Sequence, residues 1–275
     1  MEQQLWDELS KQLWGELSNG LKEFMESTGF TTVVIGESGG LDSALVTVLA
    51  VDTLGAENVT ALTMPSEFTT EETLRDALEL CDNLGVAIHT LPISDLVDTF
   101  LETIDLTGVA HENLQARIRG VLLMGWANQH DSIVLCPSNK SEAAMGYSTL
   151  YGDTVGSYAP LWDVYKTELF RLAKWYAAKN PGVIPETTLT RPPTAELAHG
   201  QKDEDSLPPY PLLDAILESY VEGEIPESWI IATFGKTGED TIARLRRSAW
   251  KRKQEPRGVK VSTRTLEELD RSTEK

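Results

Sequence analysis

A glycine- and serine-rich loop, Ser38-Gly39-Gly40-Leu41-Asp42-Ser43, carries the clearest chemical signal in the sequence. It lies between the β-branched run 31–35 and a segment of helical character that starts near Asp42. Glycines let a backbone approach a ligand closely, and the amides at the start of a helix attract anions. The loop has neither a lysine nor the GxGxxG spacing, which excludes the Walker A and dinucleotide fingerprints. Asp42 would repel a bare phosphate, so the loop predicts a nucleotide site in which Mg²⁺ lies between this carboxylate and the phosphates.

Four further residues could take part in such a site. Asn113 and Arg117 are four residues apart on a predicted helix and share a face, where a buried guanidinium would suit phosphate or carboxylate. Glu142 follows a predicted strand, where an open α/β sheet forms its ligand crevice, and it could supply a second carboxylate to the metal. Lys166 could contact a phosphate. The alternatives are a helix cap for Asp42, a surface salt bridge for Arg117, a helix-start acid for Glu142 and an exposed lysine at 166.

The charge pattern restricts the partners. With 24 basic and 43 acidic residues the formal net charge is −19, which repels nucleic acid and anionic membranes over most of the surface. From Arg244 to Arg264 the trend reverses, with nine Lys or Arg and one acid, Glu255. This stretch is either a solvated basic face or a local site for phosphate or carboxylate.

The elements that must position these residues alternate between strand and helix. β-branched or apolar runs predict strands, and apolar residues at helical spacing predict helices. This alternation predicts an α/β fold, a doubly wound parallel sheet with a helical C-terminal part. The predicted strands are 31–35, 58–63, 86–91 and 132–136, and the predicted helices are 3–27, one starting near 42, 70–84, 96–102, 113–128, 212–221 and 240–251.

We expect a single domain with four parts: an N-terminal helix at 1–29, a nucleotide-binding core at 30–180, a loop at 186–210, and C-terminal helices with a basic tail at 211–275. Prolines punctuate the chain beyond residue 180, and segment 186–210 is long and polar. Loops of this length are usually functional lids or disordered. Two cysteines make no disulfide framework, and neither a signal peptide nor a membrane span is evident, so we expect a cytoplasmic protein.

The loop resembles the signature of the ATP pyrophosphatases, Ser-Gly-Gly-x-Asp-Ser after a first strand. Further motifs, which span roughly residues 30–260, are similar to those of NAD synthetases, above all the synthetase part of glutamine-dependent ones. In chain order they are Asn-x-x-Ala-Arg at 113–117, Asn-Lys-Ser-Glu at 139–142, Tyr-Gly-Asp at 151–153, Tyr-Lys-Thr at 165–167, Asp203-Glu204-Asp205-Ser206-Leu207-Pro208-Pro209-Tyr210 and Trp250-Lys251-Arg252. Two positions depart from the pattern: Pro137 replaces a Thr that touches ATP, and Trp250 replaces a His or Tyr.

The resemblance implies a Rossmann-like fold of the adenine nucleotide alpha hydrolase type and the amidation of deamido-NAD by ammonia. In this reaction ATP forms an acyl-adenylate, and AMP and pyrophosphate are released. It assigns catalysis to Asp42 and Lys166, and Mg²⁺ to Asp42 and Glu142. The implied ATP contacts are Gly36, Glu37, Ser38, Gly39, Gly40, Leu41, Asp42, Ser43, Pro137 and Lys166. The implied deamido-NAD contacts are Asn113, Arg117, Glu142, Tyr147, Ser148, Thr149, Leu150 and Lys251.

The resemblance also implies a homodimer, with segment 186–210 as a mobile loop over the active site. The apolar stretch 114–126 suits a dimer interface. Since 37 residues precede Ser38, we expect no glutaminase domain, and Cys81 and Cys136 are expected to be small core residues. Three alternatives stay open: another adenylating amidotransferase, a nucleotide-binding regulator without turnover, and a synthetase subunit fed by a separate glutaminase.

Overall fold

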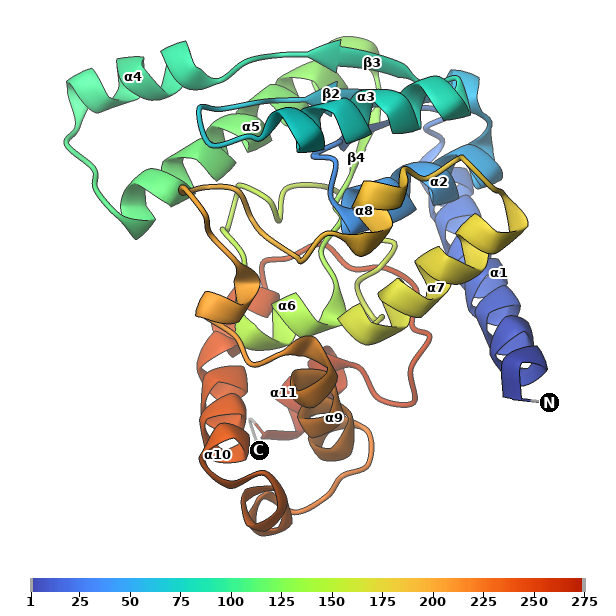
Figure 1. Ribbon diagram of the computed structural model, residues 1–275, viewed down its shortest axis with the longest axis vertical. Coiled ribbons are helices and arrows are strands. Elements are labelled where there is room, and N and C mark those ends of the chain that lie inside the picture. Colours follow the sequence, from blue (N-terminus) through green and yellow to red (C-terminus); the bar gives the residue numbers. More distant parts are fainter. Residues whose placement is uncertain (1, 274–275) are drawn as a thin grey trace.

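A parallel sheet of four strands occupies the upper half of the structure as drawn in Figure 1, a computed structural model that describes residues 2–273. Its strands are β1 (Val33–Gly36), β2 (Val59–Thr63), β3 (Ala87–Thr90) and β4 (Ile133–Leu135), in the order β3-β2-β1-β4. Val33 pairs with Val59 on one side and with Ile133 on the other. All four strands were predicted, and each is shorter than its apolar run by one to two residues. The predicted α/β class is confirmed.

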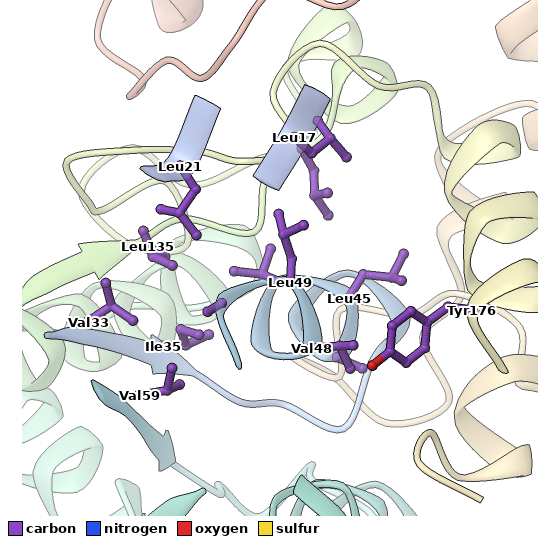
Figure 2. Packing of buried hydrophobic residues seen from close by; sticks show 14 of the residues in the cluster. Leu17, Leu21, Val33, Ile35, Leu45, Val48, Leu49, Val59, Leu135 and Tyr176 are labelled. Atoms are coloured by element: carbon purple, nitrogen blue, oxygen red, sulfur yellow. The ribbon is translucent and has the colours of Figure 1, made fainter. Parts of the chain in front are cut away.

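Helices cover both faces of the sheet, which is why the central strand β1 is apolar throughout. On one face, Val33 and Ile35 of β1 pack beneath α2 (Leu41–Leu54) and α1 (Glu2–Thr28), and Figure 2 shows Leu17 and Leu21 of α1 over the leucines of α2. On the other face, Val34 packs against α4 (Ser94–Thr103) and α5 (Val109–His130). Successive residues of β1 therefore serve two different cores.

Helix α3 (Glu71–Leu84) follows its local signals closely. The Thr70 hydroxyl caps it by accepting from the Thr73 amide at 3.2 Å, and Gly85 ends it in the left-handed conformation. The helices predicted at 70–84, 96–102 and 113–128 are confirmed, each slightly shifted or extended. Within residues 2–273, no helix is long and apolar enough to span a bilayer.

A third hydrophobic cluster lies below the sheet, where α6 (Lys140–Met145) packs against α9 (Tyr210–Val221), α10 (Glu227–Arg252) and α11 (Leu266–Thr273) (Figure 1). The prediction for α10 was wrong at its start: the helix begins at Glu227 rather than near residue 240. It bends at Gly235 (φ 59°), and the glycines and threonines before residue 240 mask its helical periodicity. Four helices were not predicted, namely α6, α7 (Lys166–Lys179), α8 (Glu186–Thr190) and α11. The remaining described elements are 3₁₀ turns at Ala56–Asn58 and Asp203–Asp205.

Candidate active site

The predicted phosphate loop connects β1 to α2. Gly40 caps α2 in an extended conformation, and Gly39 is left-handed with φ +81°. A side chain at position 39 would also meet the Thr73 carbonyl oxygen at 2.1 Å, so only glycine fits there. The hydroxyls of Ser38 and Ser43 lie 3.1 Å apart at the loop mouth. The loop thus brings two hydroxyls and the amides of a helix start to one place.

Glu37 shapes this loop from inside. Its buried carboxylate accepts hydrogen bonds from the Gly39 amide at 3.0 Å and from the hydroxyls of Ser43 and Thr47 at 2.7 Å each. Burial raises the pKa of Glu37, and these three donors oppose that rise. Glu37 was predicted to touch ATP. The structure places it on the cavity wall with both carboxylate oxygens bonded to protein.

Three helix starts converge beside the loop. Asp42 lies in the first turn of α2, Glu142 in the first turn of α6, and Lys166 at the start of α7. The Lys166 ammonium donates to Asp42 Oδ2 and, at 3.1 Å, to Glu142 Oε1. Asn139 joins the two acids, because its amide donates to Asp42 at 3.3 Å and its oxygen accepts from the Glu142 amide at 3.0 Å. Lys166 is only 3% exposed, so it is not an ordinary surface lysine.

Burial and charge act in opposite directions within this cluster. Burial disfavours the charged form of Lys166, but the carboxylates of Asp42 and Glu142 prevail and raise its pKa above the ordinary value. Burial raises the pKa of Glu142 to about 8, against the attraction of Lys166 and with the repulsion of Asp42. When both carboxylates are ionised, they share one ammonium and leave negative charge facing the cavity, so a further cation and the ionised form of Glu142 favour each other.

Asp42 and Glu142 are the side chains best placed to hold Mg²⁺. The described residues contain no group of three or more His, Cys, Asp or Glu able to hold a metal ion. Mg²⁺ is commonly held by one or two carboxylates together with waters and the phosphates of a substrate. The donor set therefore fits a magnesium ion that arrives with a nucleotide.

A cavity of about 290 Å³ opens in front of this cluster. One wall is apolar and includes Leu62, Met64, Leu123 and Val155, which suits a flat base. The phosphate loop, the acidic pair and Lys166 form the polar end. The predicted site residues that line the cavity are Gly36, Glu37, Ser38, Gly39, Gly40, Leu41, Asp42, Ser43, Pro137, Glu142, Tyr147, Ser148 and Lys166.

The remaining predicted residues support the loop 146–153, which contributes Tyr147 and Ser148 to the cavity. Thr149 donates its hydroxyl proton to Asn113 at 2.6 Å, and Arg117 donates from Nε to the carbonyl of Leu150 at 3.2 Å. Lys251 binds the same loop through the carbonyls of Gly146 at 2.9 Å and Ser148 at 2.7 Å. Asn113, Arg117, Thr149, Leu150 and Lys251 are thus brought together around one loop.

The two arginines of helix α5 lie in different surroundings, and the alternative of a surface position for Arg117 holds. Arg117 is exposed rather than buried, whereas Arg119 lines the cavity and donates from Nε to the Met64 carbonyl at 3.0 Å. Burial lowers the pKa of Arg119 to about 10. Helical spacing groups Asn113 with Arg117 but cannot say which face of the helix meets the cavity. Sequence reasoning therefore missed Arg119.

Asp203 also lines the cavity without having been predicted as a site residue, although it lies in a recognised motif. One of its oxygens accepts from the Tyr210 hydroxyl at 2.8 Å, and its other oxygen has no hydrogen-bond partner among the described residues. Burial raises the pKa of Asp203, and its charge acts on Lys166 and Glu142. The acidic cluster thus has a third member, supplied by the segment 186–210.

Segment 186–210 lies across the cavity and is tied to α3 and to the phosphate loop. Arg191 pairs with the buried Asp76, reaches Glu72 at 3.2 Å and donates to the Gly39 carbonyl at 3.2 Å. Glu196 accepts from the Thr73 hydroxyl at 2.8 Å. The segment therefore has the position of a lid, and its mobility stays a prediction.

The basic stretch 244–264 is largely used within the chain. Five of its side chains form ion pairs, Arg246 with Glu227, Arg252 with Asp270, Arg257 with Glu267, Lys260 with Glu268 and Arg264 with Glu224. Lys251 holds the loop 146–153 as described above. Most of the excess of basic residues at 244–264 is therefore explained by ion pairs within the chain rather than by a separate anion site.

Comparison with known proteins decides the family. A family model described as NAD synthase matches residues 13–255, most of the chain. The chain belongs to the NAD synthase family. The glutamine-dependent NAD(+) synthetase of Thermotoga maritima is 46% identical over 260 residues, which cover 90% of this chain and 44% of that protein. The chain thus spans about half the length of this relative.

Two solved structures share the fold over nearly their whole length. NMN synthetase from Francisella tularensis superposes with a TM-score of 0.75 at 31% identity, covering 88% of this chain and 95% of that one. The NH3-dependent NAD synthetase from Campylobacter jejuni, in complex with nitrate, gives 0.73 at 28% identity with the same coverage. The resemblance of the sequence motifs to NAD synthetases is confirmed.

Proposed function

We propose that the chain amidates deamido-NAD with ammonia to form NAD, using ATP and releasing AMP and pyrophosphate. The observation that carries this proposal is the convergence of Asp42, Glu142 and Lys166 beside a lysine-free phosphate loop in one cavity. A carboxylate is a poor electrophile for ammonia, so its oxygen must first be converted into a leaving group. Cleavage of ATP at the α-phosphorus does so.

The reaction proceeds in two steps. A nicotinate carboxylate oxygen bonds to the α-phosphorus of ATP while the bond to pyrophosphate breaks, which yields an acyl-adenylate. The lone pair of ammonia then attacks the acyl carbon, AMP leaves, and the nitrogen gives up a proton. No protein nucleophile is required. The protein contributes positioning and charge stabilisation.

The residues divide between the two substrates. We assign the pyrophosphate to Ser38, Gly40 and Ser43, and charge neutralisation at the β- and γ-phosphates to Lys166. Asp42 and Glu142 would hold Mg²⁺, which when bound supplies positive charge next to the phosphates. The deamido-NAD contacts are assigned to Glu142 and to the loop 146–153, with Asn113, Arg117 and Lys251 holding that loop.

The nitrogen donor is proposed to be ammonia itself. Cys81 and Cys136 are both buried, and burial raises the pKa of each thiol to about 12. Neither can serve near neutral pH as the thiolate that glutamine hydrolysis through cysteine requires. A separate glutaminase could still deliver ammonia to the chain. We keep a cytoplasmic location as part of the same proposal.

A homodimer is proposed from the apolar face of α4 and α5. Phe100 and Val121 on these helices, and Ile104 directly after α4, are half or more exposed, and Leu96 and Met124 are 40% and 38% exposed. A second copy of the chain would cover this face, and such obligate interfaces commonly bury more than about 2,000 Å². Light scattering of an active monomer at working concentration would contradict it.

The similarity to an NMN synthetase supports a second candidate substrate. Nicotinate mononucleotide carries the same carboxylate as deamido-NAD but lacks the adenylate half. Comparing kcat/KM for the two substrates with ammonium separates the candidates. Deamido-NAD should be preferred by at least tenfold, and a preference for the mononucleotide would replace our assignment.

Turnover of the purified chain tests the proposed function directly. With ATP, Mg²⁺, deamido-NAD and ammonium chloride, we expect AMP, pyrophosphate and NAD in equal amounts. AMP release that does not depend on either nicotinate substrate would indicate another adenylating amidotransferase. ATP binding without AMP release would indicate a regulator.

A further inference from the structure

We infer that Asp214 is a positioning residue that sets the spacing of Glu142 and Lys166. Asp214 lies on α9, is 3% exposed, and is absent from the cavity lining among the described residues. Its Oδ1 accepts from the Ser141 hydroxyl at 2.5 Å, and its Oδ2 accepts from the Thr167 amide at 2.8 Å. One carboxylate thus bridges α6 and the start of α7.

The hydrogen bonds of this bridge form a chain that runs from the Lys166 backbone through Ser141 to Asp214. The Ser141 hydroxyl donates to Asp214 and accepts from the backbone amide of Lys166 at 2.9 Å. Ser141 directly precedes Glu142, and Thr167 directly follows Lys166. Asp214 therefore fixes the backbone next to each of the two side chains that meet at 3.1 Å in the cavity.

The electrostatics agree with this role. The carboxylate lies at the amino end of α7, where unpaired amides and the helix dipole favour a negative charge. Its hydrogen-bond donors, Ser141 and Thr167, are uncharged, and burial raises the pKa of Asp214 against the effect of these donors and of the Lys166 charge. Burying a carboxylate among uncharged donors costs desolvation free energy, which an apolar side chain that served only for packing would not cost. The Asp214 carboxylate instead serves to order the junction between α6 and α7, the two helices that carry Glu142 and Lys166.

Asp214→Asn is the sharpest test because it keeps the shape. An amide offers one acceptor oxygen where the carboxylate offers two. If that oxygen keeps the Thr167 amide, the new NH₂ group faces the Ser141 hydroxyl, which already accepts from Lys166. The hydroxyl proton then has no acceptor, and the junction must shift.

The inference rests on the proposed function for its catalytic readout, so metal binding is measured independently. Mn²⁺ binding with a non-hydrolysable ATP analogue, followed by electron paramagnetic resonance, should weaken about 10- to 100-fold in Asp214→Asn, as for groups that orient metal ligands. In turnover, kcat should fall and more Mg²⁺ should be needed, while KM for deamido-NAD stays within twofold. If wild-type chain forms no NAD, the proposed function fails and the Mn²⁺ comparison still stands.

Ser141→Ala removes the hydroxyl that links Asp214 to the Lys166 amide, and it provides the test if Asp214→Asn does not fold. It should show a smaller loss of the same kind, and the double variant should lose less than the sum of the two effects. Leu217→Ala, a packing change on the same helix, is the control, since it should lower stability without weakening Mn²⁺ binding. Wild-type Mn²⁺ affinity in both junction variants, or equal weakening in Leu217→Ala, would overturn the inference.

Discussion

Lys166 donates to Glu142 Oε1 at 3.1 Å, although the two side chains come from different helices. The same ammonium also pairs with Asp42, which follows the first strand. Three positions far apart in the chain thus form one charged cluster at the carboxyl ends of the strands. Ligand sites of open α/β sheets are found at this edge.

Asp42→Ala should reduce AMP formation by about 10²- to 10³-fold or more while the fold persists. The loop has no lysine, so the carboxylate is needed to bring a cation to the phosphates. Circular dichroism and an ATP-cleavage assay measure the two effects. Asp95→Ala, at the exposed start of α4, should leave the rate unchanged. Substantial Mg²⁺-dependent activity in Asp42→Ala would remove Asp42 from the metal site.

Lys251→Met should raise KM for deamido-NAD about tenfold or more and leave KM for ATP unchanged. Its ammonium holds the carbonyls of Gly146 and Ser148, and hydrogen bonds to charged groups contribute about 1.5–3 kcal/mol. Steady-state kinetics measure both constants. Lys236→Met, on the exposed face of the same helix, serves as the control. Equal increases in both KM values would indicate general damage to the site.

Arg191→Ala should release the lid. It removes the ties to Asp76 and to the Gly39 carbonyl, so we expect faster proteolysis within 186–210 and a raised KM for ATP. Asp76→Asn should weaken the same ion pair. The effect of the double variant on proteolysis and on KM should therefore be smaller than the sum of the two single effects. Unchanged cleavage of this segment in both single variants would show that the pair does not restrain it.

Asp153→Asn should change how stability depends on pH. Desolvation raises the pKa of Asp153 from the ordinary 3.8 to about 7, although the residue is exposed on one side to solvent. Between these values the folded state binds more protons than the unfolded state, so the free energy of unfolding falls as pH rises. The variant lacks this titration, so its stability relative to wild type should increase from pH 5 to pH 8, by about 1 kcal/mol or less because solvent screens the exposed carboxylate. Urea unfolding at both pH values gives the difference, and a constant difference would contradict the prediction.

Both cysteines should be unreactive in the folded protein. With each thiol pKa near 12, iodoacetamide near pH 8 should modify neither Cys81 nor Cys136 until the chain is unfolded. Glutamine should accordingly yield no NAD where ammonium does, and the rate at fixed total ammonium should rise with mildly alkaline pH as more neutral ammonia is present. Mass spectrometry and a product assay follow these outcomes. Equal rates on the two donors, without any partner glutaminase, would refute the nitrogen assignment.

The strands and several helices could be predicted because their signals are local. Runs such as 31–35 are β-branched and end in turn residues, and α3 carries both its cap at Thr70 and its terminating Gly85. Helix α10 shows the limit. Its first half contains Gly235 and Gly238, so the helical periodicity of its apolar residues is weak and the local sequence does not predict a helix there. In the structure, Ile230 and Ile242 of this helix pack into one hydrophobic cluster.

The sequence by itself determined the chemistry that is available: a lysine-free phosphate loop, two acids and a lysine in recognisable motifs. Residue type and local spacing suffice for that, because a glycine turn or a helix start is specified within a few neighbours. Only the tertiary structure decided that Lys166 lies between Asp42 and Glu142, and that Arg119 rather than Arg117 faces the cavity. Those relations depend on which face each helix buries and on contacts across many tens of residues. Such contacts follow from packing the whole chain, which no short stretch of sequence contains.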